Sequence, residues 1–125
     1  MAKSVIDAVL DAALAYIKSN ATKLCVCNSQ PTTYAHATAS YKLASVVISS
    51  ADFGSPAAGD SSGRKIAVNA QSSVSIDSSG SAAHMALVQT ASSLLIYVTT
   101  TTTTGLTAGG KVNVGAWDVE IADPT

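Results

Sequence analysis

Charge is scarce in this chain. Only 12% of the 125 residues are Asp, Glu, Lys or Arg, about half the proportion found in an ordinary soluble domain. Seven basic and eight acidic residues leave a formal net charge of −1. So small an imbalance provides no basic face for a polyanion, and we expect no nucleic-acid partner. Aromatic residues are also few, at 5%.

Cysteine and long apolar runs are scarce as well. Two cysteines, Cys25 and Cys27, are too few for a disulfide framework, and on a strand they point to the same face, a poor geometry for bonding to each other. We expect reduced packing residues in a protein made in a cytosol. The sequence has neither 18 consecutive apolar residues nor a basic segment followed by an apolar leader. We therefore expect no membrane partner and no secretory signal.

Small side chains take the place of these residues, since Ala, Ser, Thr and Gly make up 61 of the 125 residues. Disorder requires high net charge together with low hydrophobicity, and the charge is nearly zero, so the chain should fold. Its length is that of one domain with a single modest core. We expect a single domain over residues 1–125.

The clearest element is an N-terminal helix. Apolar residues recur at the three-and-four spacing of one helical stripe, with Ser4 as a natural N-cap. The pattern predicts an amphipathic helix over about residues 5–18, in a helical segment bounded by residues 4 and 19. We expect Ile6, Leu10, Leu14 and Ile17 to be buried. The full stripe is Ile6, Val9, Leu10, Ala13, Leu14 and Ile17.

Beyond Asn20 the helical period disappears and short strand-like runs alternate with Gly, Ser, Asn and Pro clusters. Seven runs predict a β sandwich over residues 23–121, with residues 34–39 as a short helical or irregular bridge. Residues 78–80 and 108–110 are typical of hairpin turns. Residues 54–63 predict a long loop, functional or mobile. The predicted strands are 23–27, 43–50, 64–70, 73–77, 82–89, 94–103 and 111–121.

The last predicted strand changes parity at Gly115. Val112 and Val114 lie on one face, whereas Trp117 and Val119 would lie on the other. A bulge at Gly115 would insert one residue and turn both apolar sets toward the same core. We therefore place Trp117 in the core.

Groups that carry chemistry are scattered along the chain. His36 and His84 do not stand at zinc-site spacing from the cysteine pair, and no Ser lies in a nucleophile elbow. The segment 59–65 lacks the Gly-Lys-Ser/Thr ending of a phosphate loop. We expect no enzyme, no catalytic residue, no cofactor, no metal and no small-molecule substrate. The loop acids Asp52, Asp60 and Asp77 do not have the spacing of a calcium loop.

Residues 66–110 contain one charged side chain, Asp77. Soluble monomers normally intersperse charges of both signs over their surface, so a neutral exterior of Ser, Thr and Ala favours contact with other protein. A neutral but well-hydrated surface is the alternative interpretation. The threonine run 99–104 is compatible with a flat ladder that orders water, but one strand makes no ladder, and we favour a β-branched strand end.

Several phrases of the sequence resemble the small virion proteins of tailed bacteriophages, and the resemblance spans nearly the whole chain. In short-tailed phages some of these are cement or decoration proteins. They are jelly-roll β sandwiches on the outside of the icosahedral head that clamp neighbouring copies of the major capsid protein. The phrases are DAVLDAAL (7–14), QPTTY (30–34), YKLA (41–44), SSADF (49–53), GRK (63–65) and AWDVEIADP (116–124).

The resemblance implies a mainly β, jelly-roll-like β sandwich with an N-terminal amphipathic α-helix. It also implies a homo-oligomer, a dimer or trimer, that binds the major capsid protein on the capsid exterior after synthesis in the bacterial host cytoplasm. The alternative is a head-fibre, tail or receptor- or carbohydrate-binding module. As contact residues we single out Phe53, Pro56, Thr99, Thr101 and Thr103.

Overall fold

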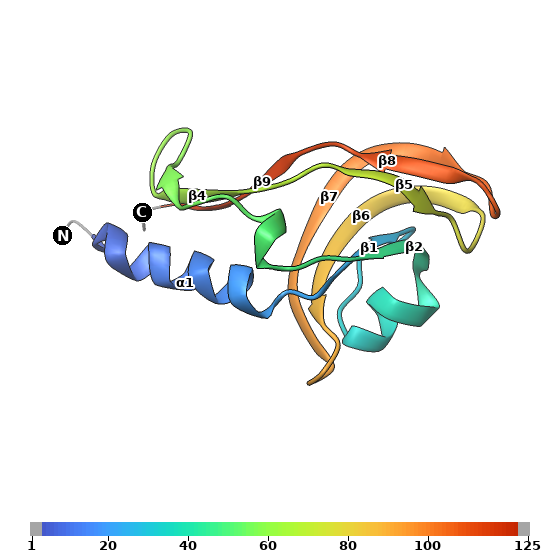
Figure 1. Ribbon diagram of the computed structural model, residues 1–125, viewed down its shortest axis with the longest axis horizontal. Helices are drawn as coiled ribbons and strands as arrows, with labels where there is room; N and C mark the ends of the chain where they lie inside the picture. The colour runs from blue at the N-terminus through green and yellow to red at the C-terminus, as the bar shows by residue number, and fades with distance from the viewer. Residues whose placement is uncertain (1–3, 123–125) are drawn as a thin grey trace.

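The computed structural model describes residues 4–122 and is mainly β, with one long helix at its N-terminal end (Figure 1). The ends of the predicted domain 1–125 lie outside these residues. Helix α1 covers Asp7–Asn20. It extends away from the four-stranded sheet and lies beside strand β4 (Arg64–Val68), so the molecule is elongated along the helix axis.

The first sheet is antiparallel and has the strand order β2-β1-β6-β7. Strand β1 has the predicted bounds, whereas β7 runs three residues beyond its predicted end. Strand β7 forms one edge of this sheet. A π-helical turn, η1 (His36–Ser40), stands where the irregular bridge was expected. The strands are β1 (Lys23–Cys27), β2 (Lys42–Val47), β6 (Gly80–Gln89) and β7 (Leu94–Leu106).

The remaining strands form two small antiparallel sheets, β3-β4-β9 and β5-β8. Together with β6 and β7 they give a nested series in which β6 pairs with β7, β5 with β8, and β4 with β9. One long hairpin folded over the core therefore supplies both sides of the molecule. These strands are β3 (Ala57–Ala58), β4 (Arg64–Val68), β5 (Gln71–Ser75), β8 (Lys111–Val114) and β9 (Trp117–Ile121).

The expected bulged strand 111–121 is instead two strands, β8 and β9, separated at Gly115 and Ala116. Their partner is interrupted as well, between β4 and β5. The break has the effect expected of a bulge: it turns the apolar side chains on both sides of Gly115 toward one core, where Val114 and Val119 are both buried. Trp117 is half-buried and packs against that core.

Neither expected hairpin forms, because both turn segments carry the chain from one sheet to another. Residues 76–79 connect β5 to β6, which begins at Gly80, and residues 107–110 connect β7 to β8. The second is still a tight turn, since the Gly110 N–H donates to the Thr107 carbonyl and Gly109 has a φ of +87°. Turn composition predicts the reversal of the chain but not which strands then pair.

Helix α1 begins two residues later than predicted. Ile6 occupies the N-cap position, no side chain caps the helix, and Ser4 lies outside it. Leu10, Leu14 and Ile17 are buried as predicted. The expectation for Ile6 is wrong, because its side chain is 70% exposed.

The apolar residues form two clusters on opposite faces of the first sheet. The main core lies between this sheet, the folded-over strands and α1, and includes Leu14, Leu24, Ile66 and Leu87. Cys25 and Cys27 share the second cluster, on the outer face under η1, where the Cys27 thiol lies 3.7 Å from the Ala37 carbonyl. Both are buried free cysteines, as expected of packing residues.

Edge strand β7 is irregular at two places. Ile96 is an extra residue between the pairs Leu87↔Tyr97 and Val88↔Leu95. Further along, Ala82 pairs with Thr104 and His84 with Thr100, so three threonines lie opposite Ala83. Bulges bend and twist an edge strand, and they reduce its capacity to pair with another chain.

Candidate functional site

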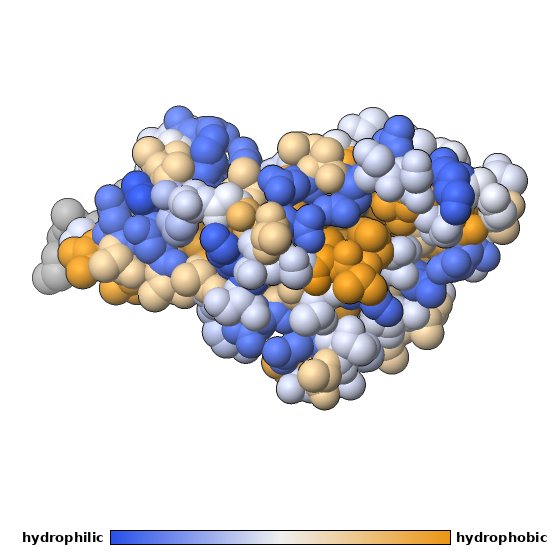
Figure 2. Space-filling model, viewed as in Figure 1, coloured by the Kyte–Doolittle hydropathy of each residue, from blue (hydrophilic) through white to orange (hydrophobic). Residues whose placement is uncertain are grey.

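Large apolar side chains are exposed mainly on α1. Ile6, Val9 and Tyr16 are 70%, 55% and 53% exposed. With the exposed Ala13 they stand at spacings of three, four and three residues and form one uncharged face, which we call the outer stripe. Figure 2 shows apolar colour at the free end of the helix and along its lower side. Exposed apolar patches of this kind mark contact sites.

A second stripe runs beside the outer stripe and fixes the helix. Leu10, Leu14, Ile17 and Ala21 are buried, and the helix packs against β4 and the 3₁₀ turn η2 (Ser50–Asp52). The three-and-four spacing of apolar residues does not distinguish these two stripes and predicts a single one. Helix α1 packs against the protein on one side only, so half of the predicted apolar stripe is not covered by any element among the described residues.

Ion pairs hold the opposite flank of α1. Arg64 Nε donates to Asp11 Oδ1 at 2.8 Å and Arg64 Nη2 to Asp11 Oδ2 at 3.4 Å, a two-point contact that fixes orientation. This hydrogen bonding, above all other contacts, raises the pKa of the Arg64 guanidinium. Lys18 Nζ donates to the Gly54 carbonyl at 3.1 Å. The charged flank therefore faces the body of the protein, and the outer stripe is left neutral.

The five predicted contact residues do not lie on one surface. Phe53 is buried in the main core at 5% exposed, so its assignment to a contact surface is wrong for this structure. Pro56 is half-buried near α1, and its carbonyl accepts from Arg64. Thr99 and Thr101 are half-buried on β7, and Thr103 is exposed. Only the threonines lie together.

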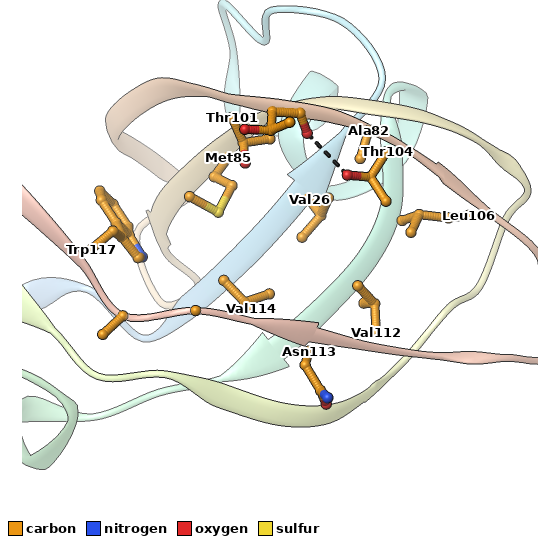
Figure 3. Close-up of a pocket in the computed structure, with 13 residues that line it drawn as sticks. Val26, Ala82, Met85, Thr101, Thr104, Leu106, Val112, Asn113, Val114 and Trp117 are labelled. Carbon is orange, nitrogen blue, oxygen red and sulfur yellow. Dashed lines mark hydrogen bonds between the residues drawn. The ribbon is translucent and has the colours of Figure 1, made fainter.

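A cavity of about 280 Å³ opens beside these threonines (Figure 3). Its floor includes Val26 and Met85, and Leu106 and Val114 form part of its sides. Trp117 stands at one end, stacked on Tyr97 with ring centroids 6.0 Å apart. The cavity lies where β7 and β8 diverge, at an open side of the main core.

The His, Cys, Asp and Glu side chains of residues 4–122 do not assemble into a metal centre. No three His, Cys, Asp or Glu side chains there are grouped as metal ligands. His36 lies in the turn η1 and contacts Thr32 and Tyr41, whereas His84 lies on strand β6. Glu120 accepts a hydrogen bond from the Asp60 backbone N–H at 3.2 Å.

Membrane insertion through a helix has no structural support in the described part of the chain, where no helix combines the required length and hydrophobicity.

Comparison with models of protein families, with curated proteins and with solved structures finds no match. We therefore infer function from the outer stripe and the cavity.

The sequence contains a signal for the outer stripe but none for the cavity. The periodicity predicts Ile6, Val9 and Ala13 as positions of the apolar stripe, and of these three only Ile6 is expected to be buried. The exposed Tyr16 at the next step of the stripe was the available signal, because tyrosine commonly occupies contact surfaces. No local signal marks the cavity, since its lining residues come from five strands, β1, β6, β7, β8 and β9, and from the Gly115–Ala116 break.

The two buried thiols lead to a chemical prediction. Burial raises the pKa of Cys25 to about 11 and that of Cys27 to about 12, and the thiolate is the reactive form. At pH 8 an alkylating reagent should leave both thiols of the native protein unmodified and should label both after denaturation, as counted by mass spectrometry. Rapid labelling of the native protein would contradict the buried placement.

Proposed function

We propose that this protein is a structural virion protein, a capsid cement or decoration protein that binds the outside of an icosahedral phage head and clamps neighbouring major capsid protein subunits. The observation that carries the proposal is the outer stripe of α1. Apolar side chains exposed on a rigid helix favour a permanent protein contact. The resemblance to small phage virion proteins indicates which contact this is.

The course of the chain supports the proposal. Pairing β6 with β7, β5 with β8 and β4 with β9 is what results when one long hairpin is wrapped around a core, as in a jelly roll. Jelly-roll domains occur in viral capsids. The jelly-roll-like form of the fold is part of this proposal.

The neutral exterior also fits adhesion through many copies. Asp77, the one charged residue between positions 66 and 110, is paired with Lys42 at 3.0 Å. Salt bridges therefore contribute little to the contact, and burial of apolar and small side chains supplies most of it. In this proposal the protein is a homo-oligomer on the capsid exterior whose partner is the major capsid protein. Binding that exists only on the assembled shell stabilises that shell.

Heat resistance of phage particles provides the test. Particles without the protein should release their DNA at a lower temperature than complete particles, and added wild-type protein should restore the difference. Ala13→Asp places a charge in the outer stripe and should abolish the restoration, because burying an unpaired carboxylate is costly. Ala15→Asp is the matched control, since Ala15 is equally an exposed alanine of α1 but lies outside the stripe. It should restore heat resistance fully.

Thermal melts of the two free variants establish that both fold before they are compared on particles. Equal restoration by Ala13→Asp and Ala15→Asp would remove the outer stripe as the contact surface. Identical heat resistance with and without the wild-type protein would overturn the cement function. Complete release of the bound protein in moderate salt would overturn apolar burial as the main contribution to the contact, because screening weakens ion pairs but not apolar contacts.

A further inference from the structure

We propose that the cavity between β7 and β8 is a binding site for a small neutral molecule with an apolar body and one hydrogen-bond acceptor. This inference rests on the cavity and does not depend on the proposed capsid function. It concerns a bound ligand and involves no chemical turnover.

The cavity has the position of a ligand site. It reaches Val26 on β1, beyond both β7 and β6, and so extends deep between the two sides of the core. Its volume of about 280 Å³ lies near the lower end of ligand pockets, which range from about 300 to 1,000 Å³. A molecule the size of a single six-membered ring with a short substituent matches this space.

The lining selects a neutral ligand. None of the side chains that line the cavity is ionisable. A carboxylate, phosphate or ammonium group would lose its hydration there and find no opposite charge, which is costly. The apolar side chains of Val26, Ala82, Met85 and Leu106, which line the cavity, instead match a hydrocarbon body.

The bulge in β7 opens the cavity and provides its polar wall. Thr101, Thr102 and Thr104 line the cavity from β7, whereas Thr103, between them, does not. The Thr104 hydroxyl donates to the Thr102 carbonyl at 3.1 Å, drawn as the dashed line in Figure 3. Bulges commonly re-aim side chains beside binding sites. The ligand thus has one hydroxyl-bearing wall opposite β8, which lines the cavity with Val112, Asn113 and Val114.

Trp117 supplies the donor that gives the site its preference for an acceptor. Its Nε1 is buried and has no hydrogen-bond partner, and Figure 3 shows the nitrogen-bearing edge of the indole on the side of Val114. A buried donor without a partner is unfavourable. A small shift of this half-buried ring would bring the N–H to a ligand acceptor, and stacking on Tyr97 limits the shift.

Nuclear magnetic resonance tests the proposal directly, because Trp117 is the only tryptophan and contributes a single indole N–H signal. Three probes are titrated into the ¹⁵N-labelled wild-type protein. Cyclohexanone is neutral and has an acceptor, cyclohexane lacks the acceptor, and cyclohexanecarboxylate is charged. Cyclohexanone should shift the indole signal and the backbone amides of residues 101–104 and 112–115, and the shifts should saturate.

The other probes separate the parts of the inference. Cyclohexane should shift the same backbone amides with about two- to tenfold lower affinity, which corresponds to one hydrogen bond. Cyclohexanecarboxylate should produce no saturable shift. Equal affinity of cyclohexane and cyclohexanone would overturn the role of the Trp117 N–H. Saturable binding of the carboxylate would overturn the selection for neutral ligands.

A filled cavity provides the variant test. Ala82→Leu places a larger side chain on the cavity floor and should abolish the cyclohexanone shifts. Ala83→Leu is the matched control, since Ala83 is adjacent but does not line the cavity, and it should bind as the wild type does. Should Ala82→Leu fail to fold, the wild-type titration alone decides. The absence of saturable shifts at the indole and at residues 101–104 would overturn the site.

Discussion

Replacing Leu14 with alanine should lower the free energy of unfolding by about 2 to 5 kcal/mol. The Leu14 side chain is 0% exposed and belongs to the main core, so the substitution removes apolar contacts and leaves a cavity between α1 and the strands. Urea unfolding followed by circular dichroism gives the difference in free energy between variant and wild type. The expected loss is a large part of the stability of a domain of this size.

Val9→Ala is the matched comparison on the same helix. Val9 is 55% exposed, and exposed substitutions usually change stability by no more than about 0.5 kcal/mol. The two variants therefore distinguish the buried stripe from the outer stripe in the isolated protein. Similar losses for Leu14→Ala and Val9→Ala would mean that the outer stripe is also covered in solution.

Gly63→Ala should be the most damaging glycine substitution, with an expected loss of about 3 to 5 kcal/mol. Gly63 precedes β4 and has a φ of +72°, a region that side chains with a Cβ rarely occupy. An alanine Cβ would also overlap the carbonyl oxygen of Ile121, which lies at the end of β9. The variant would have to separate β4 from β9 at this end, and thermal unfolding measures the loss.

Gly109→Ala isolates the backbone contribution to that effect. Gly109 also has a positive φ, +87°, but a Cβ there would meet nothing within 4 Å. The expected loss is only the cost of the left-handed conformation, about 1 to 2 kcal/mol. Equal losses at the two positions would show that the close approach to Ile121 is absent in solution.

Local patterns were good predictors of the elements themselves. The alternation of buried Ile66 and Val68 with exposed Ala67 is the one expected for β4, and β1 has the predicted bounds. These features depend on residues that are neighbours in the chain. Periodicity therefore sufficed for them.

Pairing and exposure depend on distant residues and were not predictable in the same way. Whether Val9 or Leu10 faces the core depends on how wide a surface β4 and η2 offer to the helix, and no pattern within α1 contains that information. The cavity depends on three threonines standing opposite Ala83. A run of six threonines indicates strand structure, but the register against β6 determines which of them turn inward.

The nested strand pairing bears on how the chain reaches its native state. Leu94 pairs with Gln89 across a short turn, whereas Arg64, near the middle of the chain, pairs with Ile121 at the end of the last strand. Closing the large loop first would have a high entropic cost, which generally makes proteins with distant pairings fold slowly. Nesting offers a less costly order. Once β6 and β7 have joined, each outer pair closes only the short additional length of chain between it and the pair already formed, so the sheets can zip outward from a single turn.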